Sequence, residues 1–164
     1  MPWICPTCGV EHDELPLCYG AEAPWRELVS EDEFDRRVEL TGDQCIVDER
    51  IYFIRGHIEL PVEGGDVSFA WSVWCSLSEE SFAHAHERWN DPERDGDRYF
   101  GWLCTSLPTY QDSTLNLKTT VRSRPPGAVP EVLIHECEHP LFAEQRDGVS
   151  RTRVAEIAHT LLHG

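Results

Sequence analysis

The first twelve residues hold three side chains of the types that bind zinc. Cys5 and Cys8 are separated by two residues, and His12 follows four positions later. Two intervening residues allow a tight turn that aims both sulfurs at one tetrahedral centre, and zinc accepts mixed sulfur and imidazole ligands. The spacing therefore predicts a zinc knuckle in this segment.

The spacing does not fix the fourth ligand. Cys18 is nearest in the chain, His139 is remote, and a water molecule would leave an open site suited to catalysis. We expect Cys45 to be the fourth ligand. Residues 1–20 contain too few apolar residues for a core of their own, so they gain most from a bond to the rest of the protein. This ligand set predicts one structural zinc ion.

A His-Glu-x-x-His pattern spans residues 135–139. In metalloproteases this pattern lies on a helix, which brings both imidazoles to one face while the glutamate activates a water molecule. Here Pro140 disfavours a helical conformation at the second histidine, and Val132-Leu133-Ile134 is typical of a strand. In a strand, the two histidines would lie about 13 Å apart and could not share an ion. We therefore assign no catalytic residues. The alternative hypothesis is a metal-dependent hydrolase that uses His135, Glu136 and His139.

The clearest structural pattern is an antiparallel strand pair over residues 52–62 and 67–76. Apolar and polar residues alternate in both segments, and Gly64-Gly65 supplies the turn between them. Further strands are expected over residues 99–105, 115–121 and 131–135. The aromatic cluster Tyr99-Phe100-Gly101-Trp102 in the first of these is expected to be core.

Helices are expected in three places. One covers residues 24–40 with a break near Ser30, one covers residues 79–89 after the capping residue Ser78, and the last follows Ser150. The elements together predict an α+β fold, with a mostly antiparallel sheet of four to six strands and two to four helices. We divide the chain into a zinc-knuckle head, residues 1–20, and a compact body, residues 21–164.

The amino-acid composition excludes some classes of function for this protein. The 164 residues include 30 acidic and 14 basic ones, which gives a net charge of −16. This charge argues against nucleic-acid binding and suits a basic protein partner. No apolar run approaches the roughly 20 residues of a membrane span. With an odd number of cysteines, seven, and no export signal, we expect reduced thiols and a cytoplasmic protein.

Six strings of residues form a joint pattern over almost the whole chain. They are Cys5-x2-Cys8-Gly9-x2-His12-x2-Leu15-Pro16, Asp43-Gln44-Cys45-Ile46-Val47-Asp48, Tyr52-Phe53-Ile54-Arg55-Gly56-x-Ile58-Glu59-Leu60-Pro61, Trp71-Ser72-Val73-Trp74-x-Ser76-Leu77-Ser78, Tyr99-Phe100-Gly101-Trp102-Leu103 and His139-Pro140-Leu141-x2-Glu144-Gln145-x2-Gly148-Val149. In this order they resemble the bacterial family known as domain of unknown function 2199. The resemblance implies a zinc-knuckle head, and it implies no His-Glu ahead of His139.

The resemblance also implies either a shared pocket or a set of folding determinants around Arg55, Trp74 and Glu144. We take Arg55, His139 and Glu144 as the residues of a candidate pocket. The function we expect is that of a zinc-binding protein-interaction or accessory (immunity-like) module. The sequence does not indicate an oligomeric state.

Overall fold

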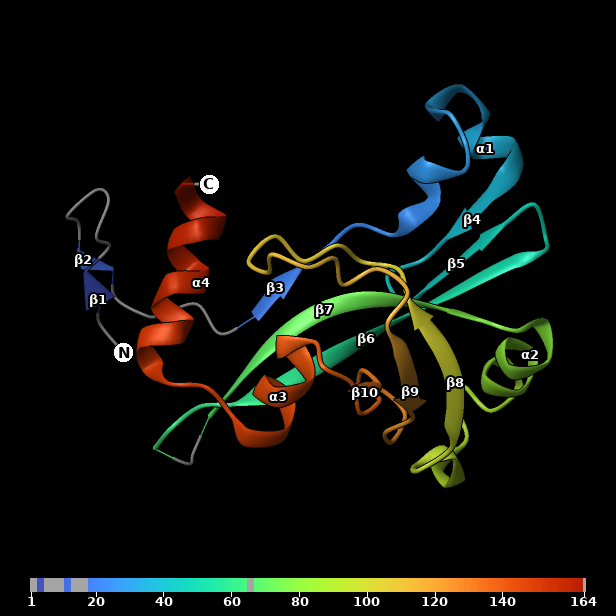
Figure 1. The fold of residues 1–164 in the computed structure, drawn as a ribbon. Coiled ribbons are helices and arrows are strands. Elements are labelled where there is room, and N and C mark those ends of the chain that lie inside the picture. The colour runs from blue at the N-terminus through green and yellow to red at the C-terminus, as the bar shows by residue number, and fades with distance from the viewer. Residues whose placement is uncertain (1–2, 5–10, 13–17, 65–66, 164) are drawn as a thin grey trace.

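The structure is a computed structural model that describes residues 3–4, 11–12, 18–64 and 67–163. Figure 1 shows the arrangement of its elements. The strands are β1 (Trp3–Ile4), β2 (Glu11–His12), β3 (Cys18–Gly20), β4 (Val38–Leu40), β5 (Gln44–Val47), β6 (Ile51–Pro61), β7 (Ser68–Leu77), β8 (Arg98–Leu103), β9 (Lys118–Arg122) and β10 (Glu131–Ile134). The α-helices are α1 (Phe34–Arg37), α2 (Glu79–Glu87), α3 (Pro140–Asp147) and α4 (Arg151–His163), and short 3-10 turns cover Pro24–Glu27, Glu31–Glu33 and Pro92–Arg94.

The α+β class is confirmed, but the sheet has more strands than expected and part of it forms a barrel. Eight strands pair in the order β3-β7-β8-β9-β10-β6-β5-β4, and β6 also pairs with β7. With this pairing, β6, β7, β8, β9 and β10 form a closed five-stranded barrel (Figure 1). Neighbouring strands run antiparallel except for β10 with β6 and β3 with β7. The prediction of four to six strands was too low because β3, β4 and β5 extend the sheet beyond the barrel.

The barrel closes where β10 meets β6, and this contact depends on a glycine. Glu131 pairs with His57, and the His57 amide donates a hydrogen bond to the Pro130 carbonyl at 2.8 Å. A Cβ atom on Gly56 would lie 2.5 Å from Val132 Cγ2 and 3.1 Å from the Pro130 oxygen. The absence of a side chain at Gly56 therefore lets the two strands approach closely.

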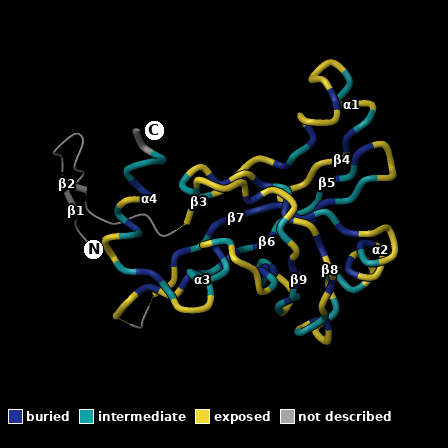
Figure 2. Tube along the Cα trace, viewed as in Figure 1, coloured by how far each residue is buried: buried dark blue, intermediate teal, exposed yellow. Residues whose placement is uncertain are grey.

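Two apolar clusters lie on opposite faces of the β6–β7 pair. The larger one fills the barrel and continues under α2, α3 and α4, with Ile58, Leu60, Phe69 and Trp71 at most 2% exposed. The smaller one covers the outer face. It contains Ala23, Trp25, Val29, Val38, Cys45, Val47, Phe53 and Trp74. Figure 2 shows buried residues concentrated along β6 and β7. These strands are sandwiched between two cores, and this arrangement positions the pocket described below.

The segment expected to form a helix over residues 24–40 is only partly helical. It consists of two 3-10 turns, the single helical turn α1 and the strand β4. Ser30, the expected break, has an extended backbone with ψ of 158°. Trp25 and Val29 are buried, whereas Leu28 is 44% exposed. The apolar stripe is too sparse for a continuous helix, so the chain bends to bury its few large side chains.

The other expected helices are confirmed with their caps. The Ser78 hydroxyl accepts a hydrogen bond from the Ser81 amide at the start of α2, and the Ser150 hydroxyl accepts one from the Arg153 amide at the start of α4. Helix α3 was not expected. It begins at Pro140, with the His139 side chain as its N-cap, so this proline starts a helix as well as ending the preceding strand-loop segment. Among the described residues, no helix is both long and apolar enough to cross a membrane.

Candidate functional site

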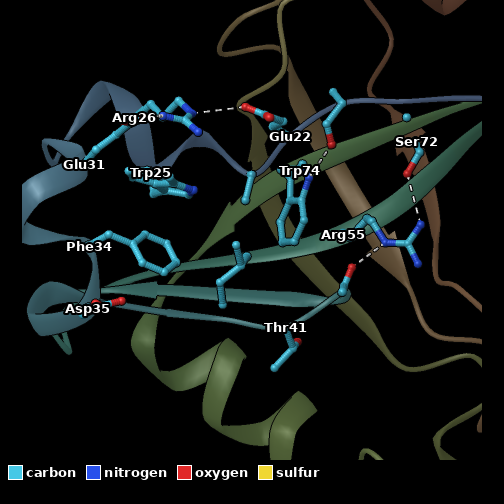
Figure 3. A pocket seen from close by; sticks show the side chains of 15 residues that line it. Glu22, Trp25, Arg26, Glu31, Phe34, Asp35, Thr41, Arg55, Ser72 and Trp74 are labelled. Carbon is cyan, nitrogen blue, oxygen red and sulfur yellow. Dashed lines mark hydrogen bonds and ion pairs between the residues drawn. The ribbon is translucent and has the colours of Figure 1, made fainter.

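An open pocket of about 680 Å³ lies on the outer face of the β6–β7 pair (Figure 3). Its floor is formed by the sheet and its walls by the segment that contains the 3-10 turns and α1. The lining residues are Gly20, Ala21, Glu22, Ala23, Trp25, Arg26, Glu31, Phe34, Asp35, Leu40, Thr41, Gly42, Arg55, Ser72 and Trp74. The volume lies within the range of pockets that hold a small ligand or a few side chains.

Arg55 lies at one end of this pocket and is held by three side-chain hydrogen bonds. Its Nε donates to the Gly42 carbonyl at 2.7 Å, one terminal nitrogen donates to Ser72 Oγ at 3.2 Å, and the other donates to Asp43 Oδ1 at 3.1 Å. The turn between β4 and β5 thus fixes an arginine that projects from β6. A guanidinium has five N–H donors, so two remain that no described residue accepts.

Aromatic rings form the other end of the pocket. The Trp25 and Phe34 rings lie 4.6 Å apart between centroids, at an interplanar angle of 56°. The indole of Trp74 donates a hydrogen bond to the Ala21 carbonyl at 3.1 Å, which ties the incoming chain to β7. Figure 3 shows Trp25 and Phe34 at one end of the pocket, Arg55 at the other, and Trp74 between them. The pocket therefore combines an apolar surface with a fixed hydrogen-bond donor.

The wall of the pocket is acidic. Residues 22–35 contain six acidic residues and one arginine, which leaves five net negative charges in the segment. The exception, Arg26, lies over the Trp25 ring at 4.5 Å and pairs with both Glu22 and Glu31. The side chains of Glu22 and Glu31 are 78% and 75% exposed. Both carboxylates are therefore paired with Arg26 and at the same time largely solvated at the mouth of the pocket.

Only some of the predicted zinc ligands lie among the described residues. Cys5 and Cys8 lie outside the described residues, and His12 lies in β2, whose backbone pairs with β1. Cys45 is fully buried in the smaller apolar cluster, and this burial raises the pKa of its thiol to about 11. Cys18, the alternative ligand, is exposed. Within the described ranges, no three His, Cys, Asp or Glu side chains are arranged to hold a metal ion.

As predicted, the His-Glu-x-x-His segment is not helical. Residues up to Ile134 belong to β10, and α3 starts only at Pro140. Each histidine has its own protein partners. His135 Nε2 lies 2.8 Å from Thr120 Oγ1, whereas His139 Nδ1 accepts a hydrogen bond from the Leu141 amide. The helical face on which a metalloprotease arranges this motif is not formed.

The three residues of the candidate pocket fall in two places. Arg55 lines the pocket described above, whereas His139 and Glu144 meet at Tyr110. The Tyr110 hydroxyl donates to Glu144 Oε1 at 2.7 Å, and the His139 ring lies 5.4 Å from the Tyr110 ring. Arg153 donates to the other Glu144 oxygen at 2.7 Å. Burial, followed by the bond to Glu144, raises the pKa of Tyr110. This network joins the loop before β9 to α3 and α4, which indicates a structural role.

Sequence reasoning missed part of the pocket. Nothing in the sequence placed Trp25 and Phe34 beside Arg55. Ser72 and Gly42 carried no signal, because their role is to hold the Arg55 guanidinium across strands. Likewise, no local pattern in the sequence predicted that Tyr110 and Arg153 would bind Glu144.

The fold and the pocket define a small α+β barrel protein with an open pocket on its outer face. The family described as an uncharacterized protein conserved in bacteria (DUF2199) matches residues 4–149, and the chain belongs to this family. The resemblance seen in the sequence is thereby confirmed. Neither the curated proteins nor the solved structures yielded a match to this chain.

Proposed function

We propose that this protein is an interaction module of the accessory (immunity-like) kind. Its pocket beside Arg55 would bind a segment of a partner that carries an apolar side chain next to basic residues. The observation that carries this proposal is the combination, in one pocket, of the Trp25 and Phe34 rings with an acidic wall. The rings supply desolvated contact area, and the carboxylates select for positive charge.

Three further features support binding as the function. Arg55 is positioned by three hydrogen bonds before any partner arrives, so little ordering is needed on binding. Its two remaining donors suit backbone carbonyls of an extended segment. The net charge of −16 would also accelerate association with a basic partner.

A structural zinc ion in the head belongs to this proposal. Cys5, Cys8 and His12 would supply three ligands and stabilise a segment that lacks a core. Of the two cysteines considered for the fourth position, Cys18 is exposed and Cys45 is enclosed by apolar side chains. Burial raises the pKa of the Cys45 thiol and so opposes its ionisation, whereas Cys18 is directly accessible to a metal. The described cysteines are all free, which supports a reducing, cytoplasmic location.

The test uses the full chain and two short synthetic peptides. Both peptides have a central tryptophan, which is flanked by lysines in one and by glutamates in the other. We expect the lysine-flanked peptide to bind, to shift the amide resonances of residues 21–35 and to bind more weakly as salt is raised. Glu31→Lys should weaken binding several-fold.

The matched control is Glu87→Lys, which makes the same charge change at an exposed position at the end of α2. It should leave the affinity close to that of the parent. The proposal is wrong if the lysine-flanked peptide shifts no resonance around the pocket, or if the two substitutions weaken binding equally.

A further inference from the structure

A second exposed surface lies on the outer side of β8 and β9, which run side by side in Figure 1. We call it the aromatic face and define it by Phe100, Trp102, Lys118, Thr120 and His135. In the register of the two strands, Phe100 lies opposite Thr120 and Trp102 lies opposite Lys118. His135 follows β10 and is hydrogen-bonded to Thr120, so the face extends across three strands.

The expectation that the whole cluster at residues 99–102 is core is wrong, because Phe100 and Trp102 are exposed. The cluster is split by the alternation of β8, in which Tyr99 is 7% exposed while Phe100 and Trp102 are 46% and 41% exposed. The Phe100 and Trp102 rings contact each other edge to face, with centroids 5.2 Å apart. The Phe100 ring also lies 5.7 Å from the His135 ring. Two adjacent, solvent-exposed aromatic side chains are characteristic of a protein-binding surface.

A hollow of about 330 Å³ adjoins these rings. It lies between β8 and the start of α2 and is lined by Ser76, Leu77, Ser78, Ser81, Phe100 and Trp102. This lining combines two rings and one leucine with serine hydroxyls. Such a hollow is suited to one apolar side chain, with the hydroxyls available to neighbouring backbone groups.

The paired strands of the aromatic face carry the cations Arg98 and Lys118. Lys118 and Arg98, at the two ends of the paired strands, have no ion-pair partner among the described residues. The neighbouring Arg124, in contrast, is bound by both oxygens of Glu59 at 3.1 and 2.8 Å. These cations lie beside exposed rings in a protein with 30 acidic and 14 basic residues. They complement a partner that presents carboxylates.

We propose that the aromatic face binds a segment of a partner protein that carries an apolar side chain flanked by acidic residues. The apolar side chain occupies the hollow beside Trp102, and the carboxylates face Lys118 and Arg98. Two observations favour this occupant over a single-stranded nucleic acid. The rings stand edge to face at 88° and do not present two parallel faces for successive bases. The net charge of −16 also repels a polyanion more strongly than a short segment with a few carboxylates.

The experiment follows backbone amide resonances of the full chain during titration with three probes. These are a short peptide with a central phenylalanine flanked by glutamates, the same peptide with lysine flanks, and a short oligouridine. We expect the glutamate-flanked peptide to shift the resonances of Arg98–Leu103 and Lys118–Arg122 and to leave those of residues 21–35 unchanged. Trp102→Ala should weaken this binding by about tenfold or more. Lys118→Glu should weaken it in a salt-dependent manner.

Arg50→Glu serves as the control for charge, since Arg50 is exposed, lies before β6 and does not belong to the aromatic face. This control should bind the peptide like the parent. The proposal is refuted if no resonance of β8 or β9 moves, or if Trp102→Ala and Lys118→Glu, folded by the same spectra, bind unchanged. It is also refuted if the oligouridine binds these strands more tightly than the peptide. Shifts that depend only on protein concentration would overturn it as well, since they would identify a second copy as the occupant.

Discussion

Closure of the barrel should depend on the absence of a side chain at Gly56. In Gly56→Ala the new Cβ would lie 2.5 Å from Val132 Cγ2 and 3.1 Å from the Pro130 carbonyl oxygen. Val132 is fully buried, so it cannot turn away into solvent. The Pro130 oxygen accepts the His57 amide that joins β10 to β6, so it cannot move without loss of that bond. The strands must therefore separate, or the core must repack.

The size of the effect follows from these contacts. Overpacking a well-packed core by a methyl group costs typically about 1–3 kcal/mol. Both neighbours of the new methyl are constrained, so we expect a value toward the upper end, about 2–3 kcal/mol. Small domains have a total unfolding free energy of about 5–15 kcal/mol, so the loss is easily measured.

The assay is urea unfolding followed by tryptophan fluorescence, with Gly42→Ala as the matched control. A Cβ on Gly42 would have no neighbour within 4 Å, so this substitution should change the unfolding free energy by less than about 0.5 kcal/mol. The double variant Gly56→Ala/Val132→Ala removes the closest clash. It should therefore be more stable than the sum of the two single effects predicts, by about 1 kcal/mol or more. Additive effects, or a Gly56→Ala variant as stable as the parent, would refute this account of closure.

Three further predictions concern the head, the His-Glu-x-x-His segment and His57. Protein purified without chelator should contain one zinc ion per chain by elemental analysis, and Cys8→Ser should lose it; a zinc content far below one in protein with reduced thiols would contradict the knuckle. Glu136→Gln and His135→Ala should both fold and keep the metal content of the parent, and loss of zinc in His135→Ala would support the hydrolase hypothesis instead. The pKa of His57 is lowered, first by burial and then by Arg55, with Arg124 adding to the effect and Glu59 opposing it. The unfolded chain therefore binds a proton more readily than the folded one below about pH 6.5, and stability should fall as the pH decreases through that value. His57→Gln should reduce this part of the pH dependence, measured as urea midpoints between about pH 7.5 and 5; identical profiles for parent and variant would refute the assignment.

Local signals in the sequence were enough to predict the long strands and two of the helices, α2 and α4. The alternation of residues 52–62 and 67–76 predicted β6 and β7, since a strand with one buried face repeats every two residues. Ser78 and Ser150 predicted the starts of α2 and α4, because an N-cap acts within a few residues of itself. Pro140 excluded a continuous helix through His139 for the same local reason. The family resemblance, carried by strings along the whole chain, also needed no structure.

Contacts between distant residues were decided only by the tertiary structure. Closure of the barrel brings Gly56 against Val132, and no periodicity within either strand specifies which edges meet. The whole cluster at residues 99–102 was expected to be core, but the strand places Tyr99 and Phe100 on opposite sides, and which side is covered depends on the rest of the barrel. Likewise, Arg55 and Glu144 both come from strings of the same family pattern, yet they bind different partners in different places. Propensity, capping and alternation act over a few residues, whereas a pocket is formed by side chains that only the closed sheet brings together.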